Sequence, residues 1–208
     1  MNCAQLLRSG AKQLRVEIKE TQLCALLCFI ELLQKWNKTY NLTTVEATEE
    51  IASKHILDSL SVAPYLQGNR IIDAGSGAGL PGLPLAVTHE DKEFLLLDAS
   101  AKKTRFIQQT IIEIGLKNVQ VQHQRVEQYA PPHEFDTVVS RAFAPSAKLF
   151  EYAGHLLTQG QFILMLGKQS KIQDLPSHYR LIGLYPVQIP NLNASRHVAI
   201  VEKKLTNG

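Results

Sequence analysis

A glycine-rich turn between a short apolar run and a helical pattern is the feature that most constrains this chain. The segment Ile71–Gly82 reads IIDAGSGAGLPG and contains Gly75, Gly77 and Gly79 before its final glycine. Glycine adopts positive φ without a steric penalty and lets a ligand approach the backbone closely. A simple tight turn needs only one or two glycines. The segment therefore predicts a strand, a ligand-binding turn and the start of a helix.

The region after residue 68 alternates short apolar runs with helical patterns, which is typical of parallel strands joined by crossover helices. The predicted strands are Arg70–Ala74, Glu93–Asp98, Val119–His123, Phe135–Ser140, Gln161–Leu166, Arg180–Val187 and His197–Lys203. The predicted helices are Leu83–Thr88, Ala101–Ile114 with Ser100 as N-cap and Gly115 as stop, and Ser146–Leu157. The last strands lack helix-length spacers, so the sheet should end in an antiparallel hairpin. We expect an open α/β sheet that binds its ligands beyond the carboxyl ends of the strands.

Residues 1–66 are expected to form a helical segment packed on a sheet domain of residues 67–208. Apolar residues recur there at three- and four-residue steps, at Leu23, Leu26, Leu27, Ile30 and Leu33. Thr21 is the predicted N-cap of this helix. A second helix should run from about Glu49 to Leu66, with His55 and Asp58 one turn apart. Their spacing fits a metal pair, but we favour a hydrogen-bonded interface pair.

Composition indicates a globular protein of a reducing compartment. Of 208 residues, 45% are hydrophobic and 20% are charged, and the three cysteines lack the spacing of a zinc site. The longest apolar run, Leu23–Ile30, is too short to span a bilayer, and no signal peptide is recognisable. We expect a cytoplasmic protein without membrane or metal partners. The net charge of +3 is too small by itself to indicate a nucleic-acid partner.

Two ligand classes fit the glycine-rich turn. The letters GAGLPG of Gly77–Gly82 satisfy the pattern G-x-G-x-x-G, which suggests a dinucleotide. Asp73 at the end of the first strand speaks against that interpretation, because its carboxylate would face the negative charge of the pyrophosphate. S-adenosylmethionine carries an ammonium and a sulfonium and no phosphate. An opposite charge pair at 4 Å gains about 1 kcal/mol in water and about 4 kcal/mol at an effective dielectric constant of 20. Charge therefore favours the methyl donor.

Polar residues at the ends of the next strands extend the candidate site. Asp98 ends the second strand and can accept hydrogen bonds from both ribose hydroxyls of either ligand. Val126 and Glu127 follow the third strand, where a loop can contact an adenine. Ser140 and Arg141 end the fourth strand, which lacks the Asn/Asp-Pro-Pro-aromatic motif of methyltransferases that act on exocyclic amines.

The residue inventory favours a nucleophile that needs little activation. No cysteine follows residue 28, so a thiol cannot activate a pyrimidine ring here. The N7 atom of guanine has an in-plane lone pair and no proton to remove. Catalysis at N7 then requires only alignment of that atom with the methyl carbon and exclusion of water.

Six segments in this order resemble the bacterial 16S ribosomal RNA methyltransferase G family, also called glucose-inhibited division protein B. They are WNKTYNLT (Trp36–Thr43), HILDSL (His55–Leu60), DAGSGAGLPGLPLA (Asp73–Ala86), LLDASAKKTRFI (Leu96–Ile107), RVE (Arg125–Glu127) and SRAFA (Ser140–Ala144). The resemblance implies a seven-stranded, mostly parallel class I methyltransferase fold of Rossmann-like type with an N-terminal helical extension. It also implies methyl transfer from S-adenosylmethionine to N7 of guanine 527 in the 16S RNA of the 30S subunit.

The resemblance also assigns roles to single residues. Gly75, Gly77 and Leu80 would line the methionine and ribose parts of the cofactor, and Val126 and Glu127 would bracket the adenine. Arg141 would lie between cofactor and RNA, both as a cofactor-binding residue and as the catalytic residue, with its planar guanidinium on a phosphate or on O6 of guanine. RNA backbone contacts are expected at Lys168, Arg196 and His197. We expect a monomer.

Two other interpretations remain open at this point. GAGLPG and Asp98 also fit a nicotinamide-dependent oxidoreductase, although the sequence has no separate substrate domain. A non-enzymatic RNA-binding or assembly factor that retains the fold is compatible with the same residues.

Overall fold

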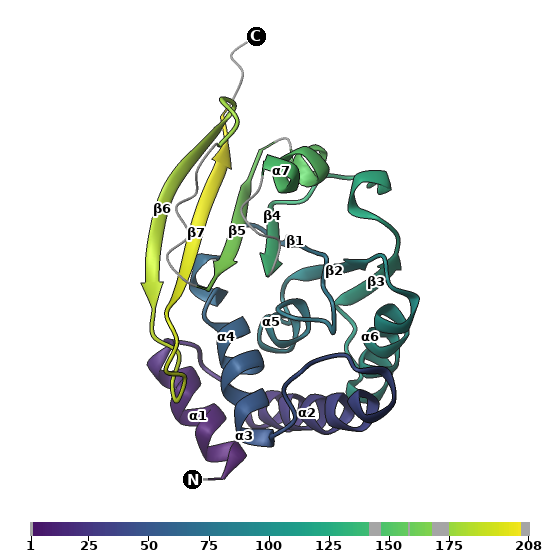
Figure 1. The fold of residues 1–208 in the computed structure, drawn as a ribbon, viewed down its shortest axis with the longest axis vertical. Coiled ribbons are helices and arrows are strands. Elements are labelled where there is room, and N and C mark those ends of the chain that lie inside the picture. The colour runs from purple at the N-terminus through teal and green to yellow at the C-terminus, as the bar shows by residue number, and fades with distance from the viewer. Residues whose placement is uncertain (1, 142–146, 158, 168–174, 205–208) are drawn as a thin grey trace.

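The fold is centred on one mixed sheet. The computed structural model describes residues 2–141, 147–157, 159–167 and 175–204. Within these ranges the chain forms a seven-stranded sheet in the order β3-β2-β1-β4-β5-β7-β6 (Figure 1). The strands are β1 Arg70–Ala74, β2 Glu93–Asp98, β3 Val119–His123, β4 Thr137–Arg141, β5 Gln161–Leu166, β6 Tyr179–Val187 and β7 Arg196–Lys203. β7 is antiparallel to both of its neighbours, whereas the other pairs are parallel. The predicted class I topology with its antiparallel end is confirmed.

Helices cover both faces of the sheet. They are α1 Cys3–Gln13, α2 Glu20–Tyr40, α3 Thr48–Ile51, α4 Asp58–Leu60, α5 Gly82–Thr88, α6 Ala101–Ile114 and α7 Ala147–Ala153. A π-helical turn covers Ala52–Leu57, and 3₁₀ turns cover Ala63–Tyr65, Val126–Gln128 and Gly154–Leu156. Successive side chains of a strand point to opposite faces. Ile71 of β1 accordingly packs with α1 to α6, and Ile72 packs with α7.

The N-terminal helices share a core with the sheet domain. Phe29 and Trp36 of α2 contact Phe106 of α6, with ring centroids 6.1 Å and 5.6 Å apart. Phe106 is fully buried, and both helices belong to one apolar cluster with β1 and β2. α2 thus lies across the outer side of α5 and α6, as Figure 1 shows.

Several predicted boundaries were wrong in detail, and β6 and β7, for example, each begin one residue earlier than predicted. Helix α2 begins after Lys19, whose backbone N–H donates to Gln22 Oε1 at 2.9 Å, so Thr21 is not the N-cap. The second predicted helix is broken into α3, the π-helical turn, α4 and a 3₁₀ turn. The hydroxyl of Ser59 in this stretch donates to the carbonyl of His55 at 2.6 Å and competes with the regular helical ladder. Strand β4 begins at Thr137, two residues later than predicted.

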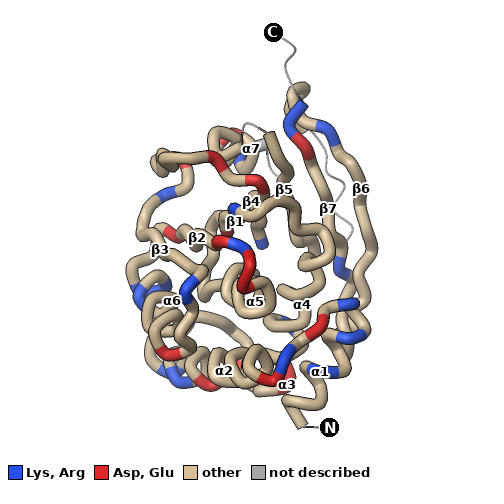
Figure 2. Tube along the Cα trace, turned by 180° about the vertical axis from the view of Figure 1, so that it is seen from behind, with Lys and Arg blue, Asp and Glu red and all other residues tan. Residues whose placement is uncertain are grey.

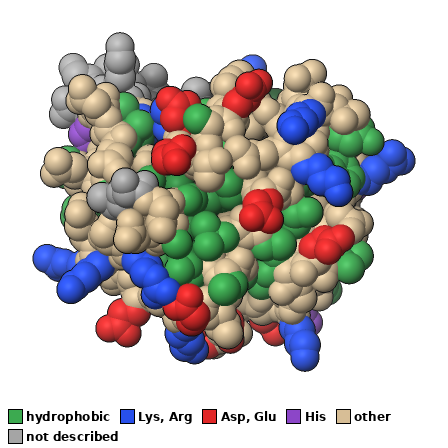
Figure 3. Space-filling model, turned by 90° about the horizontal axis from the view of Figure 1, so that it is seen from below, with side chains coloured by type: hydrophobic (Ala, Val, Ile, Leu, Met, Phe, Trp, Pro, Cys, Tyr) green, Lys and Arg blue, Asp and Glu red, His purple; other side chains and the backbone are tan. Residues whose placement is uncertain are grey.

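The surface is of mixed charge. Lys and Arg alternate with Asp and Glu along the helical layer and around the β6–β7 hairpin (Figure 2). The lower face, over α1 to α3, shows apolar side chains among scattered charges of both signs (Figure 3). Within the described residues, no helix is long and apolar enough to cross a membrane. The same part of the chain contains no cluster of three or more potential metal ligands.

Candidate active site at the carboxyl ends of the strands

The glycine-rich turn reverses the chain directly after β1. The backbone N–H groups of Gly75 and Ser76 both donate to the carbonyl of Leu97, at 2.8 Å and 3.0 Å. Gly75, Gly77 and Gly79 have φ values of 74°, 59° and 79°. These values lie in the left-handed region that favours glycine. A Cβ atom at Gly77 would meet no atom within 4 Å, so the backbone borders open space there.

Asp73 is buried beneath this turn. Its side chain is at the end of β1 and only 1% exposed, and Oδ2 accepts the N–H of Gly82 at 2.8 Å. The other oxygen, Oδ1, is buried without a hydrogen-bond partner. Burial raises the pKa of this carboxyl to about 7, against the opposing effects of the Gly82 bond and of Arg141. Oδ1 of Asp73 therefore needs an interaction partner, and a positively charged group of a ligand can supply one.

Asp98 lies at the end of β2, beside the turn. Its Oδ2 accepts the N–H of Gly77 and its Oδ1 accepts the N–H of Ser100, both at 2.8 Å. The side chain is 9% exposed. Each carboxylate oxygen can accept more than one hydrogen bond. Asp98 therefore fixes the turn and retains acceptor capacity for hydroxyl groups.

The predicted adenine and methionine contacts differ in burial. Val126 begins the 3₁₀ turn after β3 and is 7% exposed, in the cluster that contains Ala74 and Leu97. Glu127 is exposed and forms an ion pair of 3.7 Å with Arg125. Leu80, the predicted cofactor contact in the turn, is 3% exposed and belongs to the core on the α5 face.

Arg141 ends β4 and points toward the N-terminal helical segment. Its Nη1 lies 3.3 Å from Nδ1 of His55 and 3.8 Å from Oδ2 of Asp58. Burial lowers the pKa of its guanidinium, while Asp58 and Asp73 oppose that shift. His55 and Asp58 both contact Arg141 at the boundary between the helical segment and the sheet, which agrees with the predicted interface position. Among the described residues their side chains make polar contacts to other residues and not to each other. Nothing in the sequence indicates that Arg141 is their partner.

The residues predicted to contact RNA have different surroundings in the structure. Arg196 at the start of β7 is held by Asp58, with Nε 3.0 Å from Oδ1. His197 is partly buried, and its Nδ1 has no hydrogen-bond partner. Lys168 lies outside the described residues. The role of these three residues in RNA binding stays a prediction.

Ser76 is a candidate site residue that the sequence analysis did not predict. Its side chain is 1% exposed, and Oγ has no hydrogen-bond partner. The hydroxyl lies within the glycine-rich turn, two residues after β1. A signal was available, because Ser76 is the only hydroxyl residue between Asp73 and Gly82.

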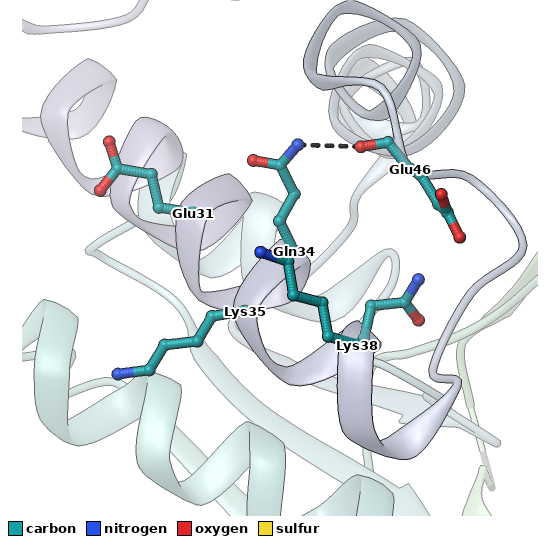
Figure 4. Close-up of a pocket in the computed structure, with 6 residues that line it drawn as sticks. Glu31, Gln34, Lys35, Lys38 and Glu46 are labelled. Atoms are coloured by element: carbon teal, nitrogen blue, oxygen red, sulfur yellow. Dashed lines mark hydrogen bonds between the residues drawn. The ribbon is translucent and has the colours of Figure 1, made fainter.

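A separate hollow lies on the outer side of α2 (Figure 4). It is lined by Glu31, Gln34, Lys35, Asn37, Lys38 and Glu46. Gln34 Nε2 donates to the backbone carbonyl of Glu46 at 2.8 Å and ties the following loop to α2. The charges of its two glutamates and two lysines cancel. The lining of this hollow therefore has no net positive charge that would attract a polyanion.

Two solved structures with a similar architecture are described as methyltransferases. A SAM-dependent methyltransferase from Aquifex aeolicus superposes with a TM-score of 0.55 over 73% of this chain and 92% of its own, at 14% identity. Magnesium protoporphyrin IX methyltransferase from Synechocystis, solved with bound SAM, gives a TM-score of 0.59 over 85% of this chain and 97% of its own, at 15% identity. At these identities the similarity concerns the fold.

The strand order, the glycine-rich turn after β1 and the acid that ends β2 define a class I methyltransferase fold. Residues 22–199 match the family described as rRNA small subunit methyltransferase G. Two relatives carry the name ribosomal RNA small subunit methyltransferase G. The protein of Nitrosococcus oceani is 44% identical over 93% of this chain and 92% of its own length. That of Psychromonas ingrahamii is 41% identical over 98% of this chain and 100% of its own. The chain belongs to the rRNA small subunit methyltransferase G family.

Proposed function

We propose that this protein transfers the methyl group of S-adenosylmethionine to N7 of guanine 527 in the 16S RNA of the 30S ribosomal subunit. One observation carries the proposal: a buried carboxylate oxygen of Asp73, without a partner, lies beneath a turn of bare glycine backbone. The names of the relatives support an RNA of the small subunit as substrate. We further propose that the protein acts as a monomer in the cytoplasm.

The residues around the turn fit a cationic cofactor. When bound, S-adenosylmethionine supplies an electrophilic methyl group on a sulfonium. Asp73 would pair with positive charge through Oδ1, and Asp98 would accept hydrogen bonds from the ribose. Gly75, Gly77 and Leu80 would line the cofactor, and Val126 and Glu127 would bracket its adenine. The hydroxyl of Ser76 offers a further hydrogen bond.

The same geometry speaks against a dinucleotide. In that interpretation the N–H groups at the start of α5 would bind the pyrophosphate. Here Asp73 Oδ2 already accepts the N–H of Gly82, the first residue of α5. A pyrophosphate would therefore meet a carboxylate instead of free donors. This contact supports the methyl-donor interpretation over the oxidoreductase.

The reaction requires positioning more than proton transfer. The N7 lone pair forms the new N–C bond while the C–S bond breaks, and S-adenosylhomocysteine leaves. No proton is removed, so no general base is needed. Arg141 would hold a phosphate or O6 of the guanine beside the cofactor. Lys168, Arg196 and His197 are proposed contacts to the RNA backbone.

A methylation assay tests the substrate. The protein is incubated with labelled S-adenosylmethionine and with 30S subunits from a strain that lacks this activity, and the label is located by chemical cleavage at 7-methylguanosine. Cleavage at guanine 527 is expected. Label at another nucleotide would refute the substrate assignment, and absence of label would favour a non-enzymatic assembly factor.

A binding experiment tests the cofactor site. Isothermal titration should show micromolar or tighter binding of S-adenosylhomocysteine and no binding of NADH. Asp73→Asn should weaken the binding of S-adenosylhomocysteine by about tenfold or more, because one charge pair is lost. The exposed Asp91→Asn is the matched control and should bind as the wild type does. Equal affinity of Asp73→Asn and wild type would contradict the assigned role of Asp73.

A further inference from the structure

A buried carboxylate joins three distant segments at the edge of the candidate site. Asp58 begins α4, and its side chain is only 6% exposed. Its Oδ1 lies 3.0 Å from Nε of Arg196 on β7, and its Oδ2 lies 3.8 Å from Nη1 of Arg141 on β4. β4 and β7 are separated by β5 in the sheet. Asp58 therefore holds two guanidinium groups that the strand ladder alone does not bring together.

His55 adds a second contact to the same arginine. Its Nδ1 lies 3.3 Å from Arg141 Nη1, and its Nε2 lies 2.7 Å from Oγ1 of Thr43. Burial, followed by the charge of Arg141, lowers the pKa of His55 to about 4. The imidazole is therefore neutral at pH 7. Its Nδ1 also lies 3.0 Å from the backbone carbonyl of Lys54. With the proton on Nε2, Nε2 donates to Thr43 and Nδ1 accepts an N–H from Arg141, whereas with the proton on Nδ1 that atom donates to Lys54.

Thr43 continues the contacts to α2. Its backbone N–H donates to Oδ1 of the buried Asn37 at 2.8 Å. The segments WNKTYNLT and HILDSL, which the cofactor site does not use, thus form one connected support for Arg141. The loop after α2 and the π-helical turn of His55 are both fixed by these hydrogen bonds.

A purely structural ion pair accounts poorly for this arrangement. Burying a carboxylate is costly, and an apolar replacement is often as stable as a buried ion pair. Burial raises the pKa of Asp58, and the two arginines act in the opposite direction. Meanwhile Arg141 bonds through Nη1 alone among the described residues. A guanidinium carries five N–H donors, and those of Nε and Nη2 are assigned below to the substrate.

We propose that Asp58 is a positioning residue. Together with His55 it holds Nη1 of Arg141, so that Nε and Nη2 of the same guanidinium face the RNA. This inference rests on the proposed function, in which Arg141 contacts the RNA beside the cofactor. Asp58 itself touches neither reactant. Arg196 is held by the same carboxylate, so that Asp58 fixes two positive charges, one at the end of β4 and one at the start of β7.

The first test is Asp58→Asn, which removes the charge at nearly constant size. We expect kcat for methylation of 30S subunits to fall about 100-fold, because misplacement of a substrate-orienting group by about 1 Å has that effect. Affinity for S-adenosylhomocysteine should change less than threefold. Glu50→Gln is the matched control, since Glu50 is an exposed acid on the same helical stretch. It should match the wild type in both measurements.

Coupling between variants separates positioning from folding. In an Arg141→Gln background, Asp58→Asn should cost less than about twofold, because the group it positions is already gone. A role in stability alone would multiply the two losses and would lower S-adenosylhomocysteine binding in parallel. Either of those results would overturn the proposal.

His55→Leu provides a second variant if Asp58→Asn folds poorly. It removes the neutral contact to Arg141 and leaves no buried charge unpaired. A fall of about tenfold in kcat with unchanged cofactor affinity is expected for loss of one hydrogen bond. Unchanged kcat in His55→Leu and Asp58→Asn, with active wild type, would refute the positioning role alone. Inactive wild type would instead refute the proposed function and this inference with it.

Discussion

At the scale of single residues, the two carboxylate oxygens of Asp73 have opposite effects on the stability of the fold. One oxygen fixes the start of α5, and the other is buried without a partner. Such an oxygen destabilises the free protein and becomes favourable only when a cation approaches. Local rules are commonly broken at functional sites in this way. The unpaired carboxylate of Asp73 should therefore lower the free energy of unfolding of the ligand-free protein.

The pH dependence of stability tests this conflict. The pKa of Asp73 is about 7 in the folded protein and 3.8 as the reference value. Between these values the folded state holds a proton that the unfolded state has lost, so stability falls as pH rises from about 4 to about 7. Asp73→Asn lacks this loss and should exceed the wild type at pH 8 by up to about 4 kcal/mol. Urea unfolding at pH 4.5 and pH 8 measures the difference.

The same comparison with Asp91→Asn supplies the control, since that side chain is exposed. Its stability should follow the wild type at both pH values. If the advantage of Asp73→Asn were equal at pH 4.5 and pH 8, the carboxyl would not titrate in the folded protein as described here.

At the scale of elements, α6 shows how a sequence signal becomes a physical stop. Gly115 has φ of 75°, and its N–H donates to Ile112 O while the N–H of Leu116 donates to Ile111 O. This is the Schellman arrangement, which requires a left-handed residue. Ser100 occupies the predicted N-cap position, but its side chain makes no capping hydrogen bond. The C-terminal prediction thus rests on a stronger constraint than the N-terminal one.

Gly115→Ala measures that constraint. No atom lies within 4 Å of an added Cβ, so the expected loss of about 1 kcal/mol comes from backbone strain alone. Gly167→Ala is the matched control, because Gly167 has equal space and no positive φ. Its stability should stay within about 0.5 kcal/mol of the wild type in thermal unfolding. Equal effects in the two variants would show that the left-handed φ does not limit α6.

At the scale of the whole molecule, the N-terminal helices and the sheet share one apolar cluster. Phe106 joins them, because it contacts both Phe29 and Trp36 across the interface. Such extensive shared burial predicts that residues 1–66 unfold together with the sheet. The division at residue 66 stays a prediction about sequence organisation.

Phe106→Ala tests cooperative unfolding. Loss of this fully buried ring should cost about 3–5 kcal/mol. Trp36 is the only tryptophan, so its fluorescence reports the helical layer, and far-ultraviolet circular dichroism reports the whole chain. Both signals should move to the same lower midpoint of denaturation. Ile112→Ala on the same helix is the control, since Ile112 is 63% exposed. Two separated transitions would mean that the helical segment unfolds independently.

The sequence by itself determined the local elements and the chemistry of the cofactor turn. The signals are the apolar runs of strand length, the turn from Gly75 to Gly82, and the acids Asp73 and Asp98. These signals depend on patterns that extend over only a few residues and can therefore be read directly from the sequence. Tertiary structure alone decided that Asp58 meets Arg141 and Arg196. These residues are far apart along the chain, and their contact follows from strand order and from where the helical layer crosses the sheet. Short-range preferences carry no information about such a meeting, because it is fixed by the packing of the whole fold.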